Sequence, residues 1–164
     1  VDTDGSPGEL TQHGACFVTL KRNGKLRGCI GTSEAHQALI LDVAENAFRA
    51  AFKDPRFPAL AADELDGLEL SISVLSPKSP MTFSGEANFL DQLRPGIDGL
   101  IIEDKGRRAL FLPSVWAGLP EVKNFVEHLK VKAGLPKTHW SGNFKAWRFL
   151  AEEISAAGLD IWGN

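Results

Sequence analysis

The sequence predicts an α+β domain whose sheet is largely antiparallel and built from hairpins, with two main helices inserted between the strands. Two observations carry this prediction: paired apolar runs closed by turns that contain glycine, and two amphipathic segments that end at proline or glycine. Strands and helices do not alternate strictly, which argues against a doubly wound parallel sheet. At 164 residues the chain is long enough for its own hydrophobic core, and we expect one domain.

The first hairpin is expected over residues 14–31, which read GACFVTLKRNGKLRGCIG. Asn23 and Gly24 join its two apolar runs, and both residues tolerate the positive φ angles that a two-residue hairpin turn requires. This pair is the strongest short-range hairpin signal in the chain.

The register of that turn predicts which residues face one another. With Asn23 and Gly24 as the turn, Leu20 faces Arg27 and Val18 faces Cys29. Side chains two residues apart on a strand point to the same face, so we expect Arg27 and Cys29 to share a face.

A helix is expected from about His36 to Lys53. Its apolar residues recur on one face at helical spacing: Leu39, Val43, Ala47, Phe48, Ala51 and Phe52. The helix should end at Asp54-Pro55, because the residue before a proline is disfavoured in the α region.

The second half of the chain predicts further strands and helices. The expected elements are a one-sided strand at 68–74, a short helix at 87–93, a hairpin at 99–112, a helix at about 120–133 and a segment at 146–153. The last segment fits a strand or a short helix, and the spacing of Trp147 and Phe149 favours a strand.

Charge and composition argue against several classes of function. Eighteen basic residues against 21 acidic ones, a net charge of −3, do not predict binding to nucleic acid. No apolar run is long enough to span a membrane, and no leader pattern opens the chain, so we expect a cytoplasmic protein. No cofactor is expected, because no glycine-rich phosphate loop opens a helix.

The cysteines and histidines predict neither a disulfide framework nor a metal site. Cys16 and Cys29 are expected to be free thiols, and the four histidines lie without the spacing of metal ligands. The oligomeric state is left open by the sequence.

Several separated motifs give the chain a resemblance to a known family. LRGCIG (26–31), AFKDPRFP (51–58), LSISVLSP (70–77), FLPSVW (111–116) and KAGL (132–135) occur in one order. On these motifs the chain resembles the AMMECR domain family, also described as AmmeMemoRadiSam system protein A. The compact stretch SVWAGLPEV (114–122) departs from the longer polar stretch that members of this family often carry there.

The resemblance implies a domain at 13–153, with a polar segment at 1–12 before it and a tail at 154–164 after it. It also implies an α+β fold with a larger and a smaller lobe. In many genomes the family resembles one part of a three-part system, beside a Memo-like protein and a radical SAM enzyme. These two proteins are the candidate partners by association, and the resemblance implies no settled activity.

The candidate site centres on the thiol of Cys29, because a neighbouring cation such as Arg27 favours the reactive thiolate form. Such a thiol could act as a nucleophile. The remaining candidates would bind a small, anionic organic ligand: Gly28 and Gly31 by permitting close approach, and Asp54 and Arg56 through the DPRFP loop.

The alternative is that these residues serve the fold. Cys29 would then fill a small gap in the core, Arg27 would pair with an acidic residue such as Asp54 or Glu69, and the glycines would only satisfy the backbone. Two functions therefore stand side by side: an enzyme or enzyme subunit that uses Cys29, and an adaptor or substrate carrier whose hairpin docks on a Memo-like partner. His36 is near in sequence, but sequence proximity alone does not make it a catalytic base.

Overall fold

The structure is a computed structural model that describes residues 7–156. It divides into two compact units: unit 1 holds the described residues up to Leu75 together with those from Glu152 onward, and unit 2 holds Ser76–Ala151. Both units combine helices with antiparallel strands, so the predicted α+β class is confirmed, with the strands divided between two sheets. None of the helices in this part of the chain is both long and apolar enough to cross a membrane.

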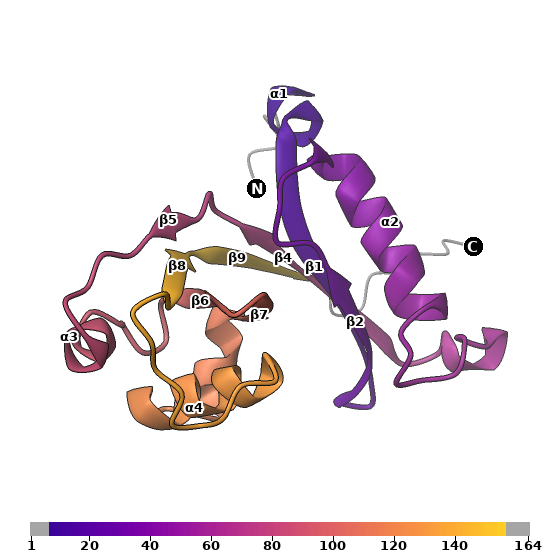
Figure 1. Cartoon of the computed structure of the whole chain (residues 1–164). Helices are drawn as coiled ribbons and strands as arrows, with labels where there is room; N and C mark the ends of the chain where they lie inside the picture. The colour runs from indigo at the N-terminus through magenta and orange to yellow at the C-terminus, as the bar shows by residue number, and fades with distance from the viewer. Residues whose placement is uncertain (1–6, 157–164) are drawn as a thin grey trace. The chain divides into compact units, whose positions relative to one another are not determined.

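Unit 1 is one sheet with a helix against one face (Figure 1). The sheet has the order β2-β1-β4-β9, and the short β3 pairs with the first residues of β1. The elements are α1 (Pro7–Thr11), β1 (His13–Arg22), β2 (Lys25–Gly31), β3 (Gln37–Ala38), α2 (Leu39–Phe52), η1 (Ala62–Glu64), β4 (Leu68–Leu75) and β9 (Ala151–Ala156).

The helix α2 packs on β1 and β2 with the predicted Leu39, Val43, Ala47 and Ala51 partly buried against the core, but its most buried positions depart from the sequence pattern. Its fully buried residues are Asp42, Asn46 and Ala50. The prediction that Phe48 and Phe52 belong to the buried face is wrong, because their side chains remain 56% and 45% exposed. The helix is rotated so that Asp42 and Asn46 can hydrogen-bond the backbone of β1, and this turns the two rings outward.

Strand β4 follows the predicted alternation on one of its faces. Leu68, Leu70 and Ile72 pack against the core beneath α2. On the opposite face Ser73 is also buried, so both faces of this strand are partly covered.

Unit 2 is a four-stranded sheet of order β5-β8-β6-β7, in which every pairing is antiparallel. The predicted hairpin and helices are present, and the segment predicted at 146–153 is extended, but it is divided between β8 and β9, which lie in different sheets. The elements are β5 (Ser79–Pro80), α3 (Glu86–Asp91), β6 (Gly99–Asp104), β7 (Arg107–Phe111), η2 (Pro113–Ala117), α4 (Val122–Lys132) and β8 (Lys145–Phe149).

The core of unit 2 is large and aromatic. The rings of Trp116 and Phe125 stack with centroids 3.7 Å apart, and Phe111 meets Phe125 edge to face. Phe89 and Phe144 extend the same cluster on its other side. Burial of ring area at this density is the main source of stability in such a core.

Candidate functional site

The hairpin that carries the LRGCIG motif turns where the sequence predicts and then departs from the expected register. Asn23 and Gly24 adopt φ angles of 51° and 73°, as the two-residue turn requires. Arg22 pairs with Lys25 and Lys21 with Leu26, after which the register shifts.

The shift is a β-bulge, and it corrects the predicted cross-strand partners. Leu20 faces Gly28 rather than Arg27, and Thr19 rather than Val18 faces Cys29. Arg27 is the extra residue of the bulge, so the two-residue alternation does not run through it. The reason for expecting Arg27 and Cys29 on one face is thereby removed.

Cys29 lies on β2, an edge strand of the sheet, where its backbone groups would otherwise lack partners. Asp54 and Arg56 supply them from the loop after α2. The N–H of Cys29 donates to Oδ2 of Asp54 at 2.9 Å, and the carbonyl of Cys29 accepts from Nη2 of Arg56 at 3.2 Å. The DPRFP loop thus caps the edge of the sheet at the motif.

Asp54 is the buried centre of this cap. Its carboxylate accepts from the N–H of Cys29, from the backbone N–H of Arg56, and from Nε and Nη2 of Arg56. The hydrogen bonds from the Arg56 side chain are the main cause that holds the pKa of Asp54 well below its usual value. The same contact raises the pKa of Arg56.

Arg56, and not Arg27, is therefore the cation that contacts Cys29, through the hydrogen bond from its Nη2 to the Cys29 carbonyl. Its side chain is 54% exposed, so the guanidinium is accessible from solvent while one edge holds Asp54. Nε and Nη2 donate to Asp54, and Nη2 also donates to the Cys29 carbonyl, so Nη1 is the group that would meet a second anion.

Arg27 is occupied by a different carboxylate. Its Nε and Nη2 each donate to Glu64 at 2.7 Å, a bidentate pair that lowers the pKa of Glu64 to about 2. The guanidinium groups of Arg27 and Arg56 both lie over the ring of Phe57. Nη1 of Arg27 is buried and has no hydrogen-bond partner among the described residues.

A row of small polar side chains crosses the sheet from Cys29. Its thiol lies 3.3 Å from Oγ1 of Thr19, which is paired in turn with Ser71 of β4. Paired residues of neighbouring strands share a face, so thiol and hydroxyls line one face of the sheet. Ser71 also lines a pocket of about 220 Å³ in unit 1, whose walls include Lys21, Glu69, Leu70, Glu153 and Ser155.

The two cysteines occupy opposite environments. Cys16 is fully buried beneath α2, and burial is the main cause that raises the pKa of its thiol to about 12. Cys29 is partly exposed. Both are free thiols, as predicted, and the buried one lies within a network in which Asp42 accepts from the N–H of Cys16 and from the hydroxyl of Thr32.

Both glycines of the motif have packing reasons. A Cβ on Gly28 would lie 2.1 Å from the carbonyl oxygen of Ala50, and a Cβ on Gly31 would overlap the ring of Phe17. Side chains at these positions would push α2 or Phe17 away. This close packing accounts for the glycines without a ligand.

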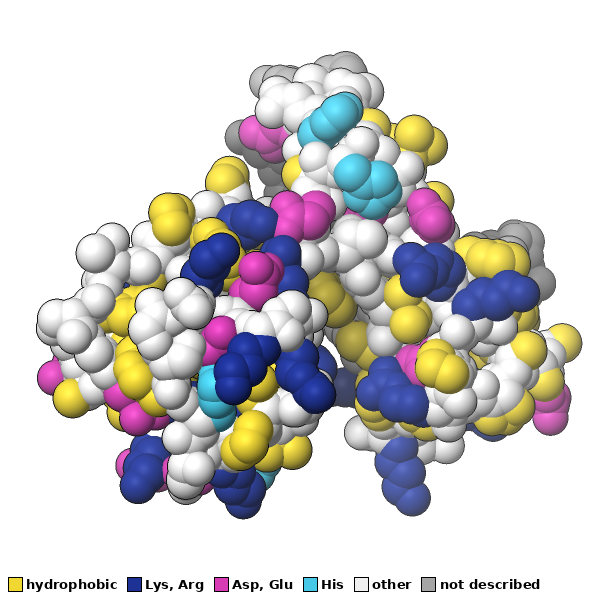
Figure 2. Space-filling view, viewed as in Figure 1, with side chains coloured by type: hydrophobic (Ala, Val, Ile, Leu, Met, Phe, Trp, Pro, Cys, Tyr) yellow, Lys and Arg dark blue, Asp and Glu magenta, His cyan; other side chains and the backbone are white. Residues whose placement is uncertain are grey.

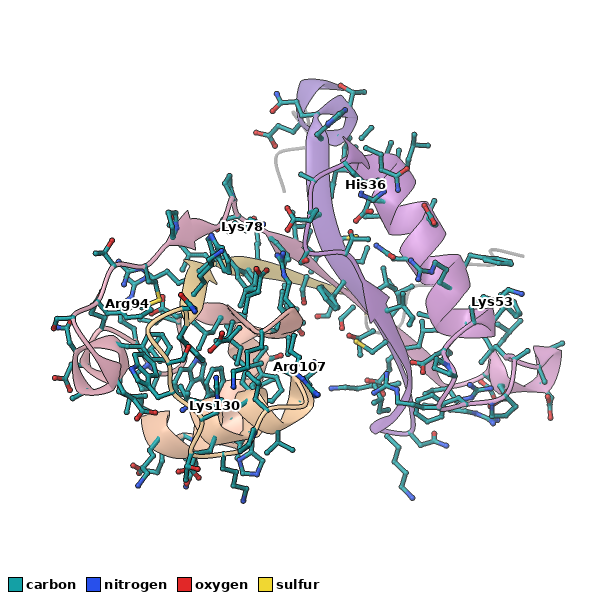
Figure 3. The ribbon with its side chains drawn as sticks, in the orientation of Figure 1. His36, Lys53, Lys78, Arg94, Arg107 and Lys130 are labelled. Atoms are coloured by element: carbon teal, nitrogen blue, oxygen red, sulfur yellow. The ribbon has the colours of Figure 1, made fainter. Side chains whose placement is uncertain are left out.

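Among the described residues, no histidine is hydrogen-bonded to the Cys29 thiol. The ring of His36 contacts the carbonyl of Glu34, and His36 lies near the start of α2, at the other end of the helix from Lys53 and the adjoining Asp54 (Figure 3). Within residues 7–156, no group of three His, Cys, Asp or Glu side chains is placed to hold a metal ion.

The structure brings the predicted candidates Cys29, Asp54 and Arg56 into contact and adds three neighbours that the sequence did not suggest. Thr19 and Ser71 were invisible because the bulge shifts the register by one residue. Glu64, the partner of Arg27, lies in η1, 37 residues further along the chain, and no local signal connects the two.

The comparisons with other proteins agree with the motifs. A sequence model of the family described as AMMECR1 matches residues 1–154. A protein of Methanothermobacter thermautotrophicus is 37% identical, over 91% of this chain and 79% of its own, and one of Thermotoga maritima is 38% identical, over 89% and 80%. The crystal structure of the uncharacterized protein PH0010 from Pyrococcus horikoshii is similar with a TM-score of 0.86, at 32% identity, over 93% of this chain and 78% of that one. The chain therefore belongs to the AMMECR1 family.

Proposed function

We propose that this protein binds a small anionic organic molecule beside Cys29, and that the Cys29 thiol takes part in its reaction. The protein would be an enzyme or the substrate-binding subunit of one. Arg56 would hold the anionic group, while Cys29 would contact the reacting part of the molecule. Arg27 would support the site through Glu64 and Phe57 rather than touch the thiol.

The observation that carries the proposal is the contrast between the two thiols. Cys16 is fully buried beneath α2, as a cysteine that serves only packing is expected to be. Cys29 is instead partly exposed, with its thiol beside the hydroxyl of Thr19 and its backbone carbonyl hydrogen-bonded by the guanidinium of Arg56. Reactive thiols are found in partly exposed settings near a cation.

An anionic ligand is favoured because the guanidinium of Arg56 has one edge on Asp54 and more than half of its side chain exposed. Asp54 fixes this side chain, so a second anion would be met by a guanidinium that is already oriented. Gly28 and Gly31 would contribute by holding the backbone of the motif against its neighbours.

The family resemblance supplies candidate partners for such a reaction. We place the protein, as a proposal, in a system with a Memo-like protein and a radical SAM enzyme. The neighbouring polar row, which ends at the pocket beside Ser71, offers room for the rest of a ligand.

The second candidate function is an adaptor or carrier without catalysis, which one observation favours. Within the described part of the chain the thiol hydrogen-bonds only to Thr19, and a hydroxyl is a poor base. A nucleophile normally has a base within hydrogen-bond reach. In the adaptor, the hairpin face around Cys29 would dock on the Memo-like partner.

The two reagents iodoacetate and iodoacetamide test the proposed anion site directly. Both alkylate the same thiolate, so the ratio of their rates at Cys29 cancels the thiolate fraction and leaves the preference for negative charge. We expect this ratio to exceed that of a free cysteine peptide, and to fall at least about threefold in Arg56→Gln.

The controls separate the two arginines. Arg56→Lys keeps the charge and should retain most of the preference, whereas Arg27→Gln should change it less than Arg56→Gln does, because the Arg27 side chain is only 11% exposed and Arg56 is the one hydrogen-bonded to Cys29. A ratio equal to that of the peptide, unchanged in Arg56→Gln, would remove the anion site. A thiol at Cys29 that reacts only after unfolding would favour the adaptor.

A further inference from the structure

The outer side of α2 carries an apolar stripe that nothing in unit 1 covers among the described residues. Ile40, Leu41, Phe48 and Phe52 are 45–57% exposed, and Ala44 lies between them on the exposed side. The rings of Phe48 and Phe52 contact each other, with centroids 5.1 Å apart. In Figure 2, yellow hydrophobic and dark blue basic side chains adjoin over the region of α2. Apolar patches of this kind mark interaction surfaces.

The stripe cannot be hidden by rotating the helix. Asp42 and Asn46 fix the inner side, because Asp42 accepts from the N–H of Cys16 and from Thr32, and Asn46 donates to the carbonyl of Cys16. Turning Phe48 inward would break this network and leave buried polar groups unpaired. The outward orientation of the rings is therefore built into unit 1.

Charged residues lie on one flank of the stripe. Glu45 and Arg49 are exposed, one helical turn apart, on the side that continues from Phe52 around the helix. The acidic residue is nearer the N-terminal half of α2 and the basic residue nearer the C-terminal half. The aliphatic and small residues likewise lie toward the start of the helix and the aromatic ones toward its end.

We propose that this stripe pairs with the same stripe of a second copy of the chain, with the two α2 helices antiparallel about a two-fold axis. An antiparallel two-fold pairing brings like flanks together and opposite ends together. With the axis near Asn46–Ala47, Glu45 of each copy meets Arg49 of the other. Leu41 then meets Phe52 of the other copy, and Ala44 leaves room for Phe48.

The parallel arrangement is less favourable on the same residues. It would set Phe48 against Phe48 at one level and leave Ala44 against Ala44. It would also place the two helix dipoles side by side in the same direction, which is unfavourable. The antiparallel form matches large side chains to small ones and positive charge to negative charge. Both matches are properties of this one helix, which makes the surface complementary to itself.

The area of the stripe determines how strong the dimer is expected to be. The 14 residues of α2 extend about 21 Å, so one helix pair buries less than the roughly 1,600 Å² of a standard interface. The dimer should therefore be weak and depend on concentration. Sedimentation velocity of the full chain from about 10 µM to about 1 mM should show the average mass rising from one chain toward two.

Substitution of the stripe should weaken this association. Phe48→Ser should shift the monomer–dimer midpoint at least about tenfold upward. Val131→Ser is the matched control, because Val131 is similarly exposed, at 50%, on α4, and it should leave the midpoint unchanged.

A charge exchange tests the antiparallel arrangement itself. Glu45→Arg alone and Arg49→Glu alone should each weaken the dimer, and the combined variant should restore it, since the pair across the axis is then re-formed in reverse. A wild-type chain that is monomeric throughout overturns the proposal, and so does a combined variant weaker than either single one. It is also overturned if the chain dimerises only after removal of residues 157–164, because the tail would then be the occupant of the stripe.

Discussion

The helices α2 and α4 hold comparable places in their units, since each packs against a sheet, but they bury opposite kinds of side chain. The helix α4 buries Phe125, Val126 and Leu129, and its one buried charge, Lys130, donates to Glu86 at 2.6 Å. The helix α2 buries Asp42 and Asn46 and exposes its rings. The core of unit 2 is thus stabilised by aromatic packing. In unit 1, the most buried side of α2 instead makes hydrogen bonds that hold β1 in place.

This difference relates to the site. The buried polar residues of α2 hold β1 and the segment after Gly31, and the loop that follows the helix caps β2 at Cys29. A helix packed only by apolar contacts could shift by small amounts at little cost, whereas directional hydrogen bonds define one position. We infer that unit 1 uses polar contacts where the position of Cys29 matters.

The largest expected effect tests the aromatic side of the comparison. Phe125→Ala should destabilise unit 2 by about 3–5 kcal/mol, because Phe125 is fully buried and stacked on Trp116. The same change on α2, Phe48→Ala, should alter the stability of the dilute monomer by no more than about 0.5 kcal/mol. Urea unfolding is followed by tryptophan emission, which reports mainly on unit 2 because three of the four tryptophans lie there, and by far-UV circular dichroism, which reports on both units. Similar losses for the two variants would show that both helices are packed alike.

The next effect tests the cap on the edge strand. Asp54→Ala should destabilise unit 1 by about 2–3 kcal/mol, because it removes the acceptor of the Cys29 N–H and the partner of Arg56. The rate at which the buried Cys16 becomes alkylated in native conditions reports on opening of this unit. Asp66→Ala, an exposed neighbour, is the control and should leave that rate nearly unchanged. If the two variants protect Cys16 equally well, the cap contributes nothing to the unit.

A smaller effect concerns acid stability. The pKa of Glu64 is lowered to about 2 in the folded protein, mainly by Arg27, against about 4.3 in an unfolded chain. A lowered folded pKa stabilises the fold above the unfolded value, and this contribution is lost as the pH falls toward 2. The urea midpoint, followed by far-UV circular dichroism, should therefore drop more between about pH 6 and about pH 3 in the wild type than in Glu64→Gln. Identical drops would mean that Glu64 ionises as it does in the unfolded chain.

The fold was predictable where the physical cause is local. Asn23-Gly24 specifies its turn because both residues accept positive φ, and α4 is bounded by its own proline and glycine signals. The outward face of α2 was not predictable, because periodicity alone favours burying Phe48 over Asn46. The hydrogen bonds that reverse this order join α2 to β1 across 30 residues.

The candidate site was predictable in its members but not in their pairing. The motifs pointed to Cys29 and Arg56 separately, and only the fold brings the two together across 27 residues. Next to the bulge at Arg27, Gly28 packs closely against Ala50, a tertiary contact that the strand pattern does not predict. The same one-residue shift moved Thr19, rather than Val18, to the thiol.

Unit 1 leaves the thiol of Cys29 partly exposed beside polar groups and buries the thiol of Cys16. Treatment of the folded protein with iodoacetamide at about pH 8, followed by mass spectrometry of its peptides, tests this most directly. We predict a single adduct, on Cys29, with Cys16 unmodified until the chain is unfolded, because Cys16 is buried and the pKa of its thiol is raised to about 12. Modification of Cys16 at the rate of Cys29, or of neither thiol before unfolding, would contradict the account.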